Sequence, residues 1–178
     1  MERYRSLVTT GRSRKPLFLF KDTWVQIPPS PLRMKKEYFK FVSACHLFII
    51  DGNKILLLRR FNTGYEDGNY SVPAGHLSGN ERVKTAMIRE AKEEVGIGIK
   101  ESDLEFIQIM HRKSDDERID FFFLAKKWSG DIEIKEPHKC DQLGWFNLDR
   151  LPENTIPYVR RAIENYKNRI KFDQFGWD

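Results

Sequence analysis

Residues 75–97 read GHLSGNERVKTAMIREAKEEVGI, and this stretch decides how the centre of the chain folds. Between Glu81 and Val95 there is no proline or glycine, and apolar residues recur at spacings of three and four. This pattern predicts a helix with one apolar face. Gly96 is expected to end it, because glycine adopts the left-handed C-cap conformation without strain.

Three carboxylates crowd one face of the predicted helix. Glu90 and Glu94 are four residues apart and Glu93 is three from Glu90, so the side chains occupy neighbouring positions. A bare E-x-x-E-E pattern of this kind is usually a solvated charged face, here relieved in part by Lys84 and Lys92. The alternative is that divalent cations neutralise the cluster, since magnesium prefers a few carboxylates together with substrate phosphates.

Three other residues of the stretch support the metal interpretation. The guanidinium of Arg89 can orient a carboxylate through paired hydrogen bonds, and Glu81 at the mouth of the helix is its natural partner. Gly75 has no side chain, which allows a backbone oxygen to approach a cation closely.

The spacing of these residues resembles the signature of the Nudix hydrolase family. Gly75, five residues, Glu81, seven residues and then Arg89-Glu90-Ala91-x-Glu93-Glu94-x-Gly96-Ile97 match it at every specified position. The resemblance covers roughly Phe39 to Tyr166, because LLLRR and YSVPAG before the box and WFNLDRLP after it also match. Ala74 departs from the P-G-G of many nucleotide-pool members, which weakens any inference of one substrate from this local similarity.

The resemblance implies a Nudix fold, which is an α/β/α sandwich around a mixed sheet, and hydrolysis of a nucleoside diphosphate linked to another group. It implies that Glu90, Glu93 and Glu94 bind magnesium or manganese, with the Gly75 carbonyl completing the shell. Glu81 and Arg89 would form an orienting ion pair. A glutamate of the box or a further carboxylate would deprotonate the attacking water, and the resemblance leaves its identity open.

Outside the box the resemblance nominates three residues. Glu136 resembles the accessory carboxylate that some members place before the Trp-containing strand, although a solvated loop glutamate is an equal alternative. Arg60 can reach a substrate phosphate, whereas Arg59 points to the opposite face of the same strand. Asn154 resembles the asparagine with which some members read an oxidised guanine, or else it caps the last helix.

The rest of the chain predicts a mixed-sheet α+β domain with helices packed on its faces. Strand patterns precede the helix, a second set follows it, and a helix closes the chain with Asn154 or Thr155 near its start. Pro73 and Gly75 are expected to stop regular structure, and the triplet at 121–123 and Trp145 are interpreted as core. The predicted strands are 39–50, 54–61, 70–73, 104–112, 118–128 and 143–152, and the closing helix is 156–170.

Composition excludes several classes of protein. The 178 residues suit one domain, and no apolar run approaches the roughly 20 residues of a membrane span. The two distant cysteines favour a reducing cytoplasm. Residues 1–33 hold seven basic and two acidic residues, which leaves 24 of each in the remainder, so the body is not expected to bind a nucleic acid polymer.

Residues 1–33 are interpreted as an N-terminal extension, and residues 34–178 as the Nudix domain. The extension lacks a sustained helical or strand period, and IPPSPL breaks either element, so it is expected to be disordered. It is a poor secretion signal, and a mitochondrial presequence is an alternative. A further hypothesis is that the coding frame was assigned a start codon too far upstream, inside a transfer-RNA gene. The residues WVQIP can be encoded by a DNA sequence that resembles the T-arm of such a gene, and the protein would then begin at Met34.

The substrate expected from these observations is a (d)NTP or oxidised dNTP, hydrolysed with Mg²⁺ (or Mn²⁺) to the monophosphate and pyrophosphate by a cytoplasmic monomer or homodimer. One alternative is ADP-ribose or a nucleotide sugar, but such enzymes often carry extra N-terminal strands that residues 1–33 do not convincingly supply. Another is a nucleotide-sensing or RNA-binding module, which would be expected to lose box carboxylates or gain a basic face.

Overall fold

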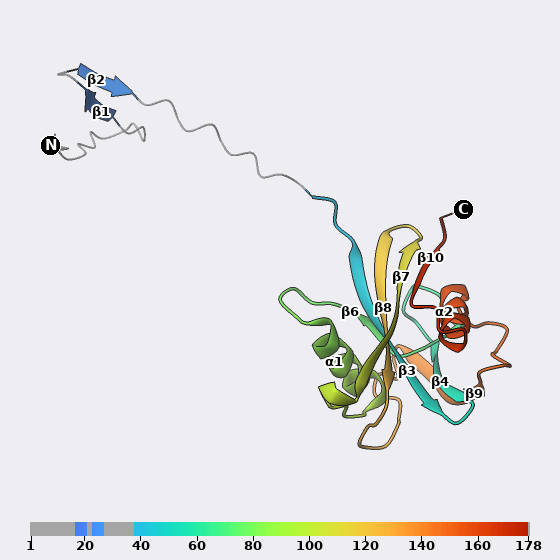
Figure 1. Ribbon diagram of the computed structural model, residues 1–178. Helices are drawn as coiled ribbons and strands as arrows, with labels where there is room; N and C mark the ends of the chain where they lie inside the picture. Colours follow the sequence, from blue (N-terminus) through green and yellow to red (C-terminus); the bar gives the residue numbers. More distant parts are fainter. Residues whose placement is uncertain (1–16, 21–22, 27–37, 178) are drawn as a thin grey trace. The chain divides into compact units, whose positions relative to one another are not determined.

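The computed structural model describes residues 17–20, 23–26 and 38–177 (Figure 1). The chain divides into two compact units, Met1–Phe39 and Lys40–Asp178. In the first, β1 (Leu17–Phe20) and β2 (Thr23–Gln26) form an antiparallel pair. These strands lie where the sequence shows no sustained strand pattern, and the other predictions for residues 1–33 concern residues outside the described part.

The second unit is built on a mixed sheet of eight strands with two α-helices. The strand order is β10-β7-β8-β3-β4-β5, while β6 pairs with β3 and β9 pairs with β4. Two pairs, β3 with β8 and β10 with β7, are parallel, and the others are antiparallel. The strands are β3 (Val42–Asp51), β4 (Lys54–Arg60), β5 (Tyr70–Ser71), β6 (Ala74–His76), β7 (Leu104–Lys113), β8 (Glu117–Ala125), β9 (Cys140–Asn147) and β10 (Phe172–Phe175).

The strand β3 has different partners at its two ends. Near its start, Ala44–His46 pairs with β6, whereas its last two residues, Ile50 and Asp51, pair with β4. Strands β3 and β4 are therefore hydrogen-bonded only beside their hairpin and diverge from it. This divergence leaves room between them for a cavity.

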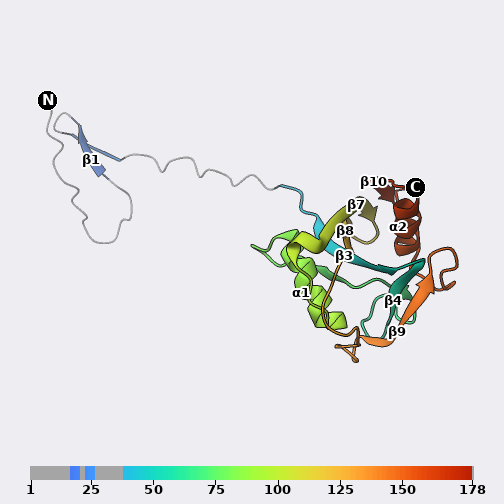
Figure 2. The ribbon, with the colours of Figure 1, turned by 60° about the horizontal axis from the view of Figure 1, so that its bottom comes forward.

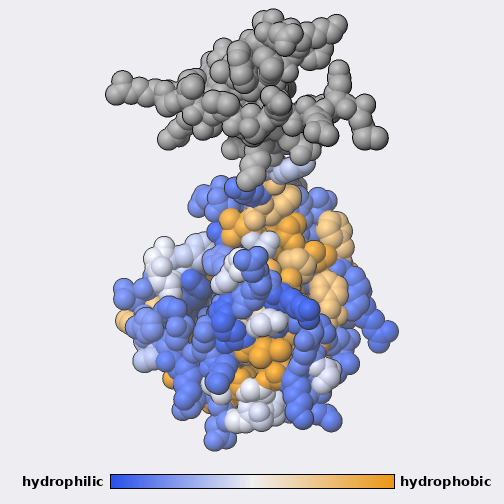
Figure 3. Space-filling view, turned by 90° about the vertical axis from the view of Figure 1, so that its left-hand side faces the viewer, coloured by the Kyte–Doolittle hydropathy of each residue, from blue (hydrophilic) through white to orange (hydrophobic). Residues whose placement is uncertain are grey.

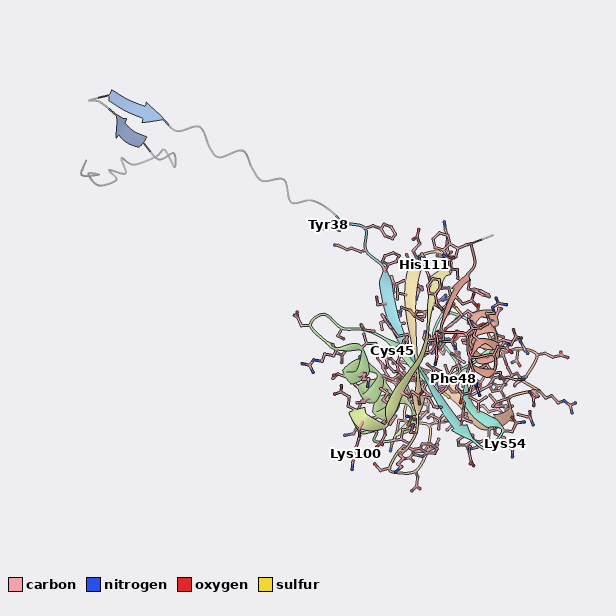
Figure 4. The ribbon with its side chains drawn as sticks, in the orientation of Figure 1. Tyr38, Cys45, Phe48, Lys54, Lys100 and His111 are labelled. Atoms are coloured by element: carbon pink, nitrogen blue, oxygen red, sulfur yellow. The ribbon has the colours of Figure 1, made fainter. Side chains whose placement is uncertain are left out.

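The helices α1 (Val83–Val95) and α2 (Pro157–Lys167) lie on opposite sides of the sheet (Figures 1 and 2). Side chains alternate along a strand, so β3 contributes to two cores. Cys45 packs in the core under α1 with Met87, and Phe48 packs in the core under α2 with Val159 (Figure 4). The short 3₁₀ helix η1 (Glu101–Asp103) connects α1 to β7. The predicted α/β/α sandwich is confirmed.

Several local predictions are confirmed and others are wrong. Helix α1 ends at Gly96 with a φ of 79°, as expected. Regular structure does not stop at Gly75, which lies inside β6, because antiparallel pairing with β3 overrides the local breaker signal. The strand β10 lies beyond the last predicted helix, and its pairing with β7 is a long-range contact that local periodicity does not reveal.

Two predictions about individual side chains also change. The N-cap of α2 is Ile156 without a side-chain cap, so neither Asn154 nor Thr155 caps it; Pro157 begins the helix, where its missing N–H costs nothing. Phe122 and Phe123 are buried, but Trp145 is 37% exposed, because alternation along β9 turns it toward the surface.

The face of this unit seen in Figure 3 is mostly hydrophilic, with hydrophobic residues near its centre. Among residues 17–20, 23–26 and 38–177, no helix is long and apolar enough to cross a membrane. The two cysteines, Cys45 and Cys140, are free and buried.

Candidate active site

A cavity of about 390 Å³ lies where β3 and β4 diverge. Residues of β3, β4, β6, α1, β7, β8 and α2 line it, together with the segment before β9. The charged or histidine side chains among them are His46, Arg60, His76, Arg89, Glu90, Glu94, Arg112, Arg118, Glu136 and Lys139.

Arg89 is the centre of an ion-pair network on α1. Its Nε and Nη2 donate to the two carboxylate oxygens of Glu81, at 3.0 and 3.1 Å. Its Nη1 donates to Glu90 Oε1 at 2.6 Å and to Glu93 Oε2 at 3.0 Å, and Nη2 also reaches the His76 carbonyl at 3.3 Å. These bonds raise the pKa of Arg89 further above its ordinary value, so the guanidinium is permanently charged and tied to β6.

Gly75 lies directly against the carboxylate of Glu90. A Cβ added to Gly75 would be 1.9 Å from Glu90 Cδ and 2.0 Å from Oε1. The glycine is needed for this close approach, not for a positive φ, because β6 is extended there. Its carbonyl accepts a hydrogen bond from Cys45 Sγ at 3.5 Å.

The carboxylate of Glu94 points toward the same strand. Its Oε2 accepts a hydrogen bond from the Ala74 N–H at 2.9 Å. Loss of contact with water raises the pKa of Glu94 to about 8, and the charges of Glu90 and Glu136 act in the same direction. Burial also raises the pKa of Glu90, against the opposing effect of Arg89. This side of the cavity, with Glu90, Glu94 and Glu136, is called the acidic wall. It disfavours the ionised forms of Glu90 and Glu94, which a bound cation would stabilise.

Two side chains outside α1 add charges to the cavity. Glu136 lines it and accepts two hydrogen bonds from Lys139 Nζ, at 2.8 and 3.0 Å. Arg60 lines it too, and its guanidinium is held by the Tyr65 carbonyl at 2.7 Å and by Thr63 Oγ1 at 3.0 Å. Arg59 pairs with Asp141 and does not line the cavity, as alternation along β4 predicts.

The residues of this wall fit a hard divalent cation. They offer carboxylate oxygens, the ligands that Mg²⁺ prefers, and the place of a Gly75 side chain is taken by the Glu90 carboxylate. In the part of the chain that the structure describes, no three Asp, Glu, His or Cys side chains already converge as a metal site. Arg89 holds Glu90 and Glu93 instead.

Not every nominated residue lines the cavity. Glu81 acts on it through Arg89, and Glu93 is exposed and does not line it. Asn154 is neither a cavity residue nor a helix cap, because its Nδ2 donates to the Gly68 carbonyl at 2.7 Å. This hydrogen bond stabilises the loop between β4 and β5.

Sequence reasoning missed several cavity residues, among them His76, Arg118 and Lys139. It also missed four buried residues in or next to the cavity, which we call the floor cluster: His46, Arg112, Asp120 and Tyr158. They come from β3, β7, β8 and α2, and each is at most 7% exposed. The only available signal was the occurrence of polar residues inside apolar strand patterns, as in RIDFFF. Such residues cannot be assigned to one site without the register of the sheet.

Known proteins resemble this chain in sequence and in fold. A model of the NUDIX domain matches residues 40–166. The NAD-capped RNA hydrolase NudC of Citrobacter koseri is 27% identical over 166 residues, covering 92% of this chain and 62% of that protein. The NudC of Chromobacterium violaceum is 28% identical, covering 90% and 58%. The chain thus spans about three fifths of the length of these curated relatives.

Solved structures give the same result. A MutT NUDIX hydrolase from Burkholderia pseudomallei has a TM-score of 0.66 and 28% identity, and the match covers 71% of this chain and 98% of that one. A NUDIX hydrolase from Nitrosomonas europaea, at 16% identity, has a TM-score of 0.62 and coverages of 96% and 93%. The second likeness concerns the fold alone.

Proposed function

The chain belongs to the Nudix family, and from this premise we propose that it is a divalent-metal-dependent pyrophosphohydrolase of nucleotides. The observation that carries the proposal is the composition of the cavity. Glu90, Glu94 and Glu136 line it together with the cationic side chains of Arg60 and Lys139. Carboxylates suit metal ions that bind phosphates, and cations suit the phosphates themselves.

The metal would be held by Glu90, Glu93 and Glu94 with the Gly75 carbonyl, and by Glu136 as an additional ligand. When bound, Mg²⁺ or Mn²⁺ supplies neutralisation of phosphate charge and a lowered pKa of bound water. Metal binding requires that Glu90 and Glu93 exchange their hydrogen bonds with Arg89 for the cation. The paired hydrogen bonds to Glu81 would keep Arg89 in place during this exchange.

The other cavity residues act on the substrate or on water. Arg60, held by Tyr65 and Thr63, would bind a phosphate oxygen of the substrate. A general base must reach the attacking water. We therefore restrict the candidates to the carboxylates that line the cavity, which are Glu90, Glu94 and Glu136.

The favoured substrate is a nucleoside triphosphate, hydrolysed to the monophosphate and pyrophosphate. A cavity of about 390 Å³ is within the range of small-ligand sites. Recognition of an oxidised guanine through Asn154 is not part of the proposal, because Asn154 does not line the cavity.

Two observations favour a second candidate, a dinucleotide of the NAD or ADP-ribose type. The relatives compared above are named NAD-capped RNA hydrolases. Strands β1 and β2 also precede the Nudix unit, which is the kind of feature expected for this alternative. An RNA that carries such a cap therefore belongs among the substrates to test.

The test is a substrate panel with Mg²⁺, scored for release of phosphate, pyrophosphate and nucleoside monophosphate. The panel contains nucleoside triphosphates, oxidised dGTP, NAD, ADP-ribose and NAD-capped RNA. Glu93→Gln and Glu94→Gln are measured beside the parent protein, with Glu101→Gln in η1 as an exposed control.

The expected result is hydrolysis of triphosphates by the parent and the control, with both box variants strongly impaired. Preferred hydrolysis of NAD or ADP-ribose would select the second candidate. Full activity of both box variants would contradict the metal site. If the parent hydrolyses no member of the panel, the proposal is contradicted and the alternative of a nucleotide-sensing module is favoured.

A further inference from the structure

The floor cluster is a buried polar group that the proposed hydrolysis does not use. His46, Arg112 and Tyr158 line the cavity, and Asp120 lies behind them with no exposed surface. The exposed fractions of His46, Arg112 and Tyr158 are 2%, 4% and 7%. Burying an arginine is costly unless it is paired and hydrogen-bonded, so its place on a cavity wall calls for a physical reason.

Arg112 is held rigidly from two directions. Its Nε donates to Asp120 Oδ2 at 2.6 Å, and its Cζ lies 4.1 Å from the centroid of the Tyr158 ring. The ring of His46 stacks on Phe122 with centroids 4.6 Å apart and meets Tyr158 edge-on. The direction of the guanidinium plane is therefore determined before any ligand arrives.

The outer edge of this guanidinium is unused. The guanidinium of arginine has five N–H donors, and within the described residues Asp120 is the only hydrogen-bond partner of the Arg112 guanidinium. The two Nη groups keep their hydrogens for another acceptor. The cluster is incompletely satisfied elsewhere as well, since His46 Nδ1 has no hydrogen-bond partner in the part of the chain described, and His46 Nε2 faces Asp120 Oδ1 at an ion-pair distance of 3.4 Å without a well-formed hydrogen bond.

The charge of the floor favours a neutral ligand. Burial alone raises the pKa of Asp120, but His46 and Arg112 outweigh it and lower the value to about 2. Asp120 is therefore ionised and neutralises Arg112. A phosphate would find little net attraction there, and cations for it are provided by Arg60 and Lys139. A neutral group with hydrogen-bond acceptors suits the floor better.

We propose that Arg112 is a specificity-determining residue whose two Nη groups bind a pair of adjacent hydrogen-bond acceptors on the nucleobase of the substrate. The inference rests on the proposed function, because it assigns the nucleobase of the substrate to the floor cluster and the phosphates to the acidic wall. Asp120 and Tyr158 are positioning residues for the guanidinium.

This geometry divides the bases into two classes. Guanine presents O6 beside N7, and an arginine fork commonly binds that pair. Cytosine presents O2 beside N3 in the same manner. Adenine has no such pair on that edge, because an amino group adjoins N7, and in uracil an N–H separates the two carbonyls. An oxidised guanine with a proton on N7 also loses the pair.

The first experiment measures base recognition without catalysis. Binding of GMP, CMP, AMP and UMP to the full chain is measured by calorimetry, and kcat/KM is measured for the four triphosphates. A guanine or cytosine nucleotide is expected to be favoured roughly 5- to 150-fold over adenine and uracil. If guanine is preferred, kcat/KM for 7-deaza-GTP, which lacks the N7 acceptor, is expected to fall to the level of ATP and UTP. If cytosine is preferred, CTP is expected to have the highest kcat/KM of the four triphosphates.

The second experiment changes the fork. Arg112→Lys keeps the positive charge but removes the paired N–H donors. A second variant combines Arg112→Gln with Asp120→Asn and replaces the ion pair by two amides that can hydrogen-bond to each other. The matched control is Arg59→Lys, because Arg59 pairs with Asp141 outside the cavity. In both floor variants kcat/KM for the preferred base is expected to fall to the level of the other bases, so the base preference is lost, while the control keeps it.

The outcomes separate the two proposals. Equal binding and hydrolysis of all four bases, or a preference for adenine or uracil, would overturn the assignment of Arg112 and leave the hydrolase proposal intact. Unchanged preference in a folded floor variant would overturn it as well. Absence of hydrolysis would overturn the proposed function, and monophosphate binding would still decide base recognition. If neither floor variant folds, the preference of the parent protein decides it.

Discussion

Two of the arginines that line the cavity, Arg89 and Arg112, differ in the number of carboxylates that each one contacts. Arg89 contacts three carboxylates, those of Glu81, Glu90 and Glu93, in a partly exposed network on α1 and the turn before it. Arg112 contacts one carboxylate, that of Asp120, in a buried pair between two strands. The same two chemical groups are thus present with an excess of negative charge in one place and with matched charges in the other.

This difference explains the separate roles proposed for the acidic wall and the floor cluster. A cluster with surplus carboxylates needs cations that the protein does not supply, so it suits a metal site. A matched buried pair attracts neither metal nor phosphate strongly, and its remaining hydrogen-bond donors can select a neutral group by geometry. The following experiments test this contrast.

The largest expected effect concerns the stability of the matched pair. Asp120→Ala leaves Arg112 buried without its partner, so the free energy of unfolding is expected to fall by about 3–5 kcal/mol. Denaturant unfolding at neutral pH measures this. Asp141→Ala, which breaks the exposed pair with Arg59, is expected to change stability much less. Equal effects of the two substitutions would show that the buried pair has no special importance.

A substitution in the acidic wall should lower the activity of the protein and not its stability. Glu94→Gln removes an anionic ligand next to β6, and kcat/KM is expected to fall by at least about 100-fold. Mg²⁺ or Mn²⁺ should raise the melting temperature of the parent and raise that of Glu94→Gln less, because binding to the native state stabilises it. An identical rise in both proteins would count against Glu94 as a ligand.

The contribution of the Arg112–Asp120 pair to the free energy of unfolding should be lost over a predictable range of acidic pH. The pKa of Asp120 lies near 2, below its ordinary value of 3.8, so its ionised form stabilises the folded state. This contribution, on the order of 2 kcal/mol, is present above pH about 4 and is lost as the pH falls toward 2. Denaturant unfolding across this range should show a smaller loss for Asp120→Asn than for the parent. Parallel curves would contradict the prediction.

The smallest expected effect comes from a single methyl group. In Gly75→Ala the new Cβ would overlap the Glu90 carboxylate, which has to move, and activity is expected to fall about 10-fold. Gly79→Ala is the matched control, because a Cβ there meets nothing within 4 Å and the φ of Gly79 is not positive. Steady-state kinetics with a Mg²⁺ titration distinguishes the two variants. Equal activities would show that Glu90 can move without cost.

Prediction from the sequence succeeded where the information is local. Helix α1, its end at Gly96 and the Arg89 network arise within one segment, because residues three and four apart lie side by side on a helix. The placement of Arg60 and not Arg59 in the cavity follows from alternation along a strand. The roles of these residues in catalysis stay predictions.

Prediction failed where distant segments decide the structure. Gly75 belongs to a strand because β3 pairs with it, and Asn154 does not line the cavity but donates a hydrogen bond to the Gly68 carbonyl in the loop between β4 and β5. Neither contact can be inferred from the neighbouring sequence. For polar residues such as Arg112 in β7, the sequence pattern predicts only that they belong to a strand.

The sequence by itself determined the acidic wall, because the turn of an α-helix brings the box glutamates together wherever the helix packs. Only the tertiary structure decided the floor. Arg112 meets Asp120 through the register of β7 with β8, and it meets Tyr158 because α2 packs on that face of the sheet. Contacts between strands and between layers depend on register and packing, which the order of residues along one segment does not specify.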